Sequence, residues 1–187
     1  MVRGVCAKAA GGVAGRAAQL RLMKPAIALL LGLVAWTQAQ AQYPSSPEKK
    51  NWFEDPFFQV SAGLPGCAPP NGPLLTFEEQ RKEAHWRVER GTSCWLAGKC
   101  RDSNAYRYDK TLAGPVNQAL RAVPEVSTAS VWVTIQRRWV FLQGCVAEPA
   151  MIERLRLAAQ AVPDVEAVVP MLEVGIVTKP RYEVRKP

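Results

Sequence analysis

Residues 129–146 read ASVWVTIQRRWVFLQGCV, and this stretch decides the fold class. Apolar side chains alternate with period two on both sides of Arg137-Arg138, which predicts two strands, 129–136 and 139–146. The two arginines then form a two-residue hairpin turn, although such turns favour Asn-Gly or Asp-Gly. An antiparallel hairpin is therefore expected at the centre of the fold.

Both faces of this hairpin are apolar. The expected register pairs residues of one aliphatic face, which is completed by Val146: Ile135 with Val140, Val133 with Leu142, and Val131 with Gly144. The second face carries aromatic and polar side chains together with one cysteine: Trp132, Thr134, Gln136, Trp139, Phe141, Gln143 and Cys145. An exposed apolar patch of that size is typical of an interaction site, unless another segment covers it.

Helices are expected on either side of the hairpin. A Gly-Pro pair places Pro115 in the first turn of a helix that runs to about Val123, and Pro149 opens a second helix. Residues 165–174 form a last strand, which is expected at an edge or with a bulge because Pro170 lacks a ladder donor. The order α-β-β-α-β predicts an α+β fold, with a three-stranded sheet and both helices on the first face.

An arm of residues 42–107 precedes this domain. Its first part is rich in Pro, Gly and Ser, which disfavours regular elements. Thr76 and Glu79 form a capping box that begins a helix of about residues 76–90, and Gly91 is its expected C-cap. The charged residues of this helix are interpreted as a solvated face, with a partner surface as the alternative.

The N-terminal residues 1–41 have the features of a secretory signal peptide. The apolar run AIALLLGLVAW follows Lys24 and ends near a small-x-small site, which predicts cleavage between Ala41 and Gln42. Met23 is an alternative start, since a complete signal follows it. The run is too short for a transmembrane helix, so we expect a periplasmic protein with no membrane span in its mature chain.

The charge of the chain is concentrated in this leader. The whole sequence has a net charge of +8, but residues 1–41 hold five of the 24 bases and none of the 16 acids. Nucleic-acid binding needs a basic domain with a basic face, so no nucleic-acid partner is expected. Residues 176–187 form a basic tail, which we expect to be mobile.

Four cysteines remain after the leader: Cys67, Cys94, Cys100 and Cys145. An even count in an exported chain predicts two disulfides, with three pairings open, and Cys94 with Cys100 would close a small local ring. Their spacing matches neither a zinc knuckle nor a Cys-x-x-Cys redox motif. His85, the single histidine, has no evident nucleophile beside it. We therefore expect no catalytic residues, no metal and no cofactor, and hence no enzyme.

Residues 108–175 resemble a BON domain, the bacterial osmotically inducible and nodulation domain. The resemblance rests on VNQALRAVPEV, VWVTIQRRWVFLQGCV and ERLRLAAQAVPDVEAVVPMLEV. Arg138 and Asp164 stand where the family usually has glycine, and only one copy of the domain is found. The resemblance implies an exported envelope protein without catalytic activity that attaches to phospholipid.

The arm is expected to cover the second face of the hairpin. The arm contains all the possible partners of Cys145, so we expect a disulfide from Cys145 to the arm. Several aromatic residues of the arm are available as cover: Trp52, Phe53, Phe57, Phe58 and Trp95. This cysteine argument favours a second core over a binding groove on that face.

A ligand site is then expected at the rim of the hairpin, at Arg137, Arg138 and Trp139. Two cations beside an indole suit an anionic membrane interface. The predicted partner is anionic phospholipid, or, as an alternative, another envelope protein for which this chain is a scaffold. The alternative interpretation is that the two arginines only keep the turn soluble.

Overall fold

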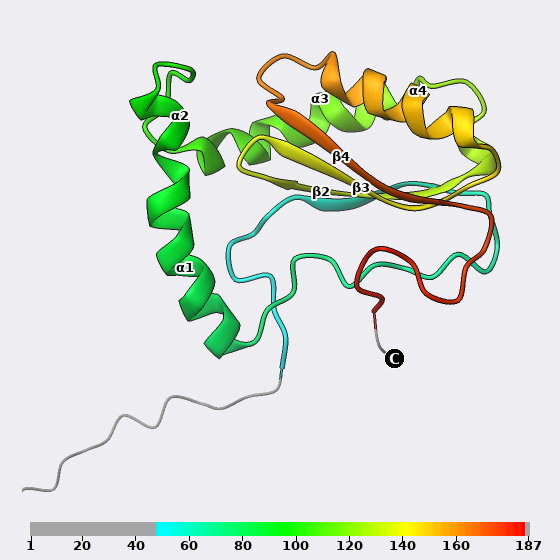
Figure 1. The fold of residues 1–187 in the computed structure, drawn as a ribbon, viewed down its shortest axis with the longest axis horizontal. Coiled ribbons are helices and arrows are strands. Elements are labelled where there is room, and N and C mark those ends of the chain that lie inside the picture. The colour runs from blue at the N-terminus through cyan, green and yellow to red at the C-terminus, as the bar shows by residue number, and fades with distance from the viewer. Residues whose placement is uncertain (1–47, 186–187) are drawn as a thin grey trace, which may run out of the picture. The chain divides into compact units, whose positions relative to one another are not determined.

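A four-stranded mixed sheet lies at the centre of residues 48–185, the part of the chain that the computed structural model describes (Figure 1). The predicted signal peptide, residues 1–41, falls outside the described residues. The strands lie in the order β1-β2-β3-β4, with bounds β1 (Phe57–Ala62), β2 (Ser130–Gln136), β3 (Trp139–Val146) and β4 (Ala167–Val174). The helices are α1 (Phe77–Gly91), α2 (Ser93–Leu96), η1 (Ala105–Tyr108), α3 (Asp109–Arg121), η2 (Val126–Thr128) and α4 (Pro149–Gln160).

The predicted hairpin forms in the predicted register. β2 and β3 are antiparallel, and Ile135 faces Val140 while Val133 faces Leu142. The turn residues Arg137 and Arg138 have φ angles of 55° and 66°. Positive φ at both central positions is what a type I′ turn requires.

The prediction of three strands was wrong, because the arm contributes a fourth. β1 pairs antiparallel with β2, and Phe58 lies opposite Val133. Phe58 packs against the aliphatic core and Val60 is buried in it, while Phe57 lies opposite Thr134 on the second face. The free edge of β2 would otherwise expose unpaired N–H and C=O groups. The alternation in β1 is only six residues long and lies among prolines and glycines, so it gives a weak strand signal.

The helices α3 and α4 cover the first face of the sheet (Figure 1). The start of α3 corrects the sequence prediction, since the helix begins at Asp109 and Pro115 lies inside it. Leu112, Val116 and Leu120 recur every four residues, and each is at most 4% exposed. Their burial extends the helix upstream of Pro115 and outweighs the backbone hydrogen bond that the proline cannot donate.

β4 is parallel to β3 and lies at the edge of the sheet, where Pro170 was expected. The predicted capping box of α1 is present, with Thr76 as the N-cap and Glu79 bonded back to its backbone. Its predicted C-cap is corrected: Gly91 is the last helical residue, and Thr92 is the C-cap. A Cβ at Gly91 would lie 2.6 Å from Oδ1 of Asn104, so a larger residue here would have to displace the side chain that accepts from the N–H of Tyr106.

The tail was expected to be mobile, but its described part packs against the arm. Tyr182 is 5% exposed, and its hydroxyl donates to the carbonyl of Ala68 at 2.7 Å. Val184 forms a β-bridge with Pro70. The tail and the arm lie side by side below the sheet, on the side away from α3 and α4 (Figure 1). The buried ring of Tyr182 and the backbone hydrogen bonds between the tail and residues 69–71 together fix this short basic segment.

Candidate functional site

The arm is held to the second face by a disulfide between Cys67 and Cys145. Cys145 is 2% exposed. The second disulfide closes the local ring from Cys94 to Cys100. These bonds select one of the three pairings that the sequence left open, and they confirm the expected link from the arm to Cys145.

The arm and tail leave part of the second face uncovered, next to the hairpin turn. A cleft of about 530 Å³ lies there, between the sheet, the arm and α1. Its lining consists of residues from β2 and β3, the turn, the arm, α1 and η1: Thr134, Gln136, Arg137, Trp139, Phe141, Gln143, Gly72, Pro73, Leu75, Glu83, Arg90 and Tyr106. The interpretation of this face as a second core is therefore corrected: it is partly core and partly cleft.

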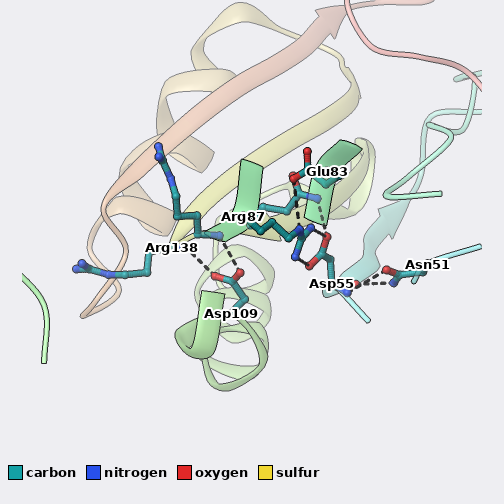
Figure 2. A network of polar contacts seen from close by, with 8 residues as sticks. Asn51, Asp55, Glu83, Arg87, Asp109 and Arg138 are labelled. Carbon is teal, nitrogen blue, oxygen red and sulfur yellow. Dashed lines mark hydrogen bonds and ion pairs between the residues drawn. The ribbon is translucent and has the colours of Figure 1, made fainter. Parts of the chain in front are cut away.

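A buried arginine fixes the α1 wall of the cleft (Figure 2). Arg87 forms two hydrogen bonds with the carboxylate of Asp55, and the Nη1–Oδ1 bond is 2.8 Å long. Its guanidinium carbon lies 3.8 Å from the ring centroid of Phe53 and 4.3 Å from that of Tyr106. The Nε atom of Arg87 is 3.3 Å from Glu83. The helix is thus joined to the arm and to η1 through one planar cation.

The hydrogen bonds and charge of Asp55 favour the charged form of Arg87. Burial disfavours the charge on Arg87, but the hydrogen bonds and charge of Asp55 outweigh burial, so the pKa of Arg87 is raised. Asp55 also accepts from the Gln136 amide at 2.6 Å, and its backbone N–H donates to the Asn51 side chain at 3.0 Å. The pair therefore also connects the arm to the end of β2.

A second buried carboxylate holds the hairpin turn. Asp109 is 2% exposed and accepts from the backbone N–H groups of Arg137 and Arg138, each at 2.7 Å (Figure 2). Burial raises the pKa of Asp109 to about 6, although the two hydrogen bonds oppose the rise. These bonds stabilise a turn whose sequence is unfavourable for type I′ geometry.

The structure separates the three residues predicted for the site. Arg137 and Trp139 both line the cleft, and the Arg137 guanidinium lies 4.9 Å from the Trp139 ring centroid. Arg138 is instead only 8% exposed, and its Nε donates to the carbonyl of Asp164 at 2.7 Å. Its guanidinium lies over the ring of Tyr108. Arg138 therefore fixes the turn from the helix side of the sheet.

Two guanidinium groups at the cleft are without acid partners. Among the described residues, neither Arg137 nor Arg90 forms an ion pair, and Arg90 lies 4.9 Å from the ring centroid of Trp86. Burial raises the pKa of Tyr106, which also lines the cleft; the charge of Glu83 adds to the rise, and the charges of Arg87, Arg137 and Arg90 partly oppose it.

Sequence reasoning did not identify Arg90, Tyr106 or Asp109. The poor turn sequence at Arg137-Arg138 was a usable signal for Asp109, because a turn without glycine or asparagine needs an outside acceptor. No local pattern marks Arg90 or Tyr106, which reach the cleft only because α1 and η1 fold against the hairpin. The indole Nε1 of Trp139 is buried and has no hydrogen-bond partner among the described residues.

A three-layer order of arm, mixed sheet and two helices defines a small α+β domain with an N-terminal cover. Residues 108–176 match the family model of the BON domain. The chain therefore carries a BON domain, which confirms the resemblance seen in the sequence. No curated protein matches the chain. This family is generally non-enzymatic, and it is consistent with an envelope-associated role. Within residues 48–185, no helix is long and apolar enough to cross a membrane.

Proposed function

We propose that this protein is an exported, non-enzymatic protein of the bacterial cell envelope that binds the headgroup of an anionic phospholipid in the cleft at the hairpin turn. The observation that carries this proposal is that Arg137 and Arg90 line the same cleft as the indole of Trp139 and, within residues 48–185, form no ion pair with an acid. Guanidinium groups suit phosphate oxygens because they present parallel N–H donors.

The other properties of the cleft are compatible with a headgroup. Its floor combines the aromatic rings of Trp139 and Phe141 with the amides of Gln136 and Gln143. Indole rings favour the boundary between headgroups and acyl chains. Glu83 is the acid of the lining, and it lies against Arg87 rather than against Arg90 or Arg137. An anion in the cleft therefore meets positive charge first.

Arg138 takes a different part in this proposal. Its buried guanidinium and the bond of its backbone N–H to Asp109 fix the turn, so that Arg137 projects into the cleft. The proposed headgroup ligands are therefore Arg137, Trp139 and Arg90, with Arg138 as a positioning residue.

Vesicle co-sedimentation tests the proposal. Residues 42–187, the chain that the predicted cleavage would leave, are mixed in the oxidised state with vesicles of phosphatidylcholine or of phosphatidylcholine and phosphatidylglycerol. We expect binding that needs the anionic lipid and weakens with salt. Each near-surface base contributes about 1 kcal/mol, so Arg137→Ala should weaken binding about fivefold. Arg121→Ala, on the helix side, is the matched control. Equal binding of the two variants would contradict the proposed site.

A protein-interaction scaffold is the second candidate function. Its support is the outer side of α1, where Trp86 is 46% exposed beside a shallow depression lined by Lys82 and His85. His85 lies 3.3 Å from Glu89 on the same helix. If the wild type binds no vesicle, pull-down of a defined envelope protein that is lost in Trp86→Ala would favour this scaffold function.

A further inference from the structure

The ring closed by Cys94 and Cys100 presents an apolar tip outside the BON domain. Trp95 is 49% exposed and Leu96 is 73% exposed. The sequence had suggested that Trp95 covers the second face, but Trp95 lies exposed on this ring instead. Ala97, Gly98 and Lys99 complete the exposed tip. Trp95 and Leu96 are thus exposed next to each other, and residues 94–100 of the ring contain no acidic side chain.

The ring is held in one conformation. The backbone N–H groups of its tip donate within the ring or to α2 and its cap: Leu96 to Thr92, Ala97 to Ser93, Gly98 to Trp95 and Lys99 to Cys94. Gly98 has a φ of 67° and no atom within 4 Å of an added Cβ, so the tip is open. Because these N–H groups are already bonded, moving them out of water costs no donor hydrogen bond, while the carbonyls of the open tip stay in contact with headgroup water in a shallow position.

The base of the ring is joined to the hairpin end of the domain. The backbone N–H groups of Arg101 and Asp102 donate to the hydroxyl of the buried Tyr108, at 2.8 and 2.9 Å. The Arg101 side chain lies 2.9 Å from the carboxylate of Asp164, whose carbonyl accepts from Arg138. The apolar tip is therefore continuous in structure with the turn that holds Arg137 in the cleft.

We propose that this ring is a shallow membrane anchor, in which Trp95 and Leu96 enter the interfacial layer of the bilayer while Lys99 stays among the headgroups. The inference rests on the proposed lipid binding and adds a second, apolar contact to it. Tryptophan favours the membrane interface, leucine gains free energy by leaving water, and lysine extends its ammonium group to phosphate. Among the described residues Lys99 forms no ion pair, so its charge is available to the headgroups.

The anchor and the cleft contribute to vesicle binding through different forces, and these forces respond differently to added salt. Binding through Arg137 is electrostatic and weakens as salt is added, whereas transfer of Leu96 out of water does not. A variant of the ring should therefore lose the part of the binding that persists at high salt. Leu157 on α4 is 53% exposed and provides a matched control for Leu96.

The test measures the partition coefficient of residues 42–187 on phosphatidylcholine–phosphatidylglycerol vesicles, at low and high salt. We expect Leu96→Asp to lower it about tenfold at both salt concentrations, and Leu157→Asp to leave it within about twofold. Equal partitioning of the two variants, with Arg137→Ala still impaired, would overturn the anchor and leave the cleft intact. Failure of the wild type to bind any vesicle would refute both proposals.

Depth-dependent quenching provides a second test that does not need a charged substitution. Vesicles whose lipids carry bromine on the upper part of the acyl chain quench indoles that lie in the interface. In an Arg137→Ala background, which weakens the contact of the cleft and its Trp139 with lipid, Trp95→Phe should lower the remaining quenching per bound molecule, whereas Trp86→Phe, at a site 46% exposed, should leave it unchanged. Quenching that is unchanged in Trp95→Phe would overturn the anchor. If Trp95 is not quenched by these lipids and the ring instead binds a purified envelope protein, the ring is a protein-binding site and not a membrane anchor.

Discussion

Replacing Asp109 by asparagine should remove a specific pH dependence from the stability of the fold. Burial raises the pKa of the Asp109 carboxyl to about 6 in the folded protein, against an ordinary value of 3.8. Between these two values the folded state holds a proton that the unfolded state releases. The free energy of unfolding therefore increases, at this site, as the pH falls from about 6 towards 3.8, and it is lost again as the pH rises through about 6.

The size of the effect follows from the two pKa values. A difference of this size corresponds to about 3 kcal/mol, an order-of-magnitude figure that is applicable because Asp109 is only 2% exposed. Asparagine retains one acceptor for the turn but does not titrate, so it has no such pH dependence. It also presents an amide N–H₂ group to one of the two turn N–H groups, which costs one hydrogen bond at every pH.

Urea unfolding at a series of pH values between 4 and 7 provides the assay, with both disulfides oxidised. The difference in unfolding free energy between the wild type and Asp109→Asn should change by about 3 kcal/mol over this range, in favour of the wild type at the acidic end. The subtraction removes surface carboxyls such as Glu173, whose lowered pKa acts in the opposite direction. A difference that stays constant with pH would refute the reasoning.

Three further predictions concern the same architecture. Replacing both Cys67 and Cys145 by serine should lower the unfolding free energy by about 4 kcal/mol, because this disulfide closes a loop with a sequence separation of 78. Denaturant titration measures the unfolding free energy, and a loss below about 1 kcal/mol would contradict the arm's role as a tethered cover. Gly144→Ala should be severely destabilising, because the new Cβ would lie 2.0 Å from a backbone oxygen at a residue with a φ of 130°. Gly114→Ala in α3 has open space around the new Cβ and should stabilise the fold by about 0.5–1 kcal/mol. Thermal melts compare the two variants, and similar melting temperatures would be inconsistent with this packing. Arg87→Met should lower the unfolding free energy by about 3–5 kcal/mol, because it leaves the buried carboxylate of Asp55 without its cation. Hydrogen exchange should show α1 opening before the rest of the fold, and a fully protected α1 would argue against the ion pair as its anchor.

Local patterns were sufficient to predict the BON domain. Period-two alternation fixed the register of β2 and β3, and the capping box at Thr76 located the start of α1. These signals are local because the residues that determine each element lie within a few positions of one another. The start of α3 was predicted wrongly from Pro115, because it depends on the burial of Leu112, which is a tertiary effect and not a local signal.

The site was harder to predict because it is assembled from distant segments. Counting cysteines led to the bond between Cys145 and the arm, but it did not show how much of the second face the arm would leave open. The burial of Arg138 depends on the carbonyl of Asp164, which is 26 positions away. Charge pattern alone treats Arg137 and Arg138 alike, whereas the turn places one in the cleft and the other against the helices.

The most direct test of the account is to observe the cleft while an anionic lipid is added. Indole N–H resonances of residues 42–187 would be followed by NMR during titration with a short-chain phosphatidylglycerol below its micelle concentration. We expect a saturable shift of the Trp139 resonance, which is absent with short-chain phosphatidylcholine and strongly reduced in Arg137→Ala. An unchanged Trp139 resonance, or equal shifts with the two lipids, would contradict the proposal that this cleft binds an anionic headgroup.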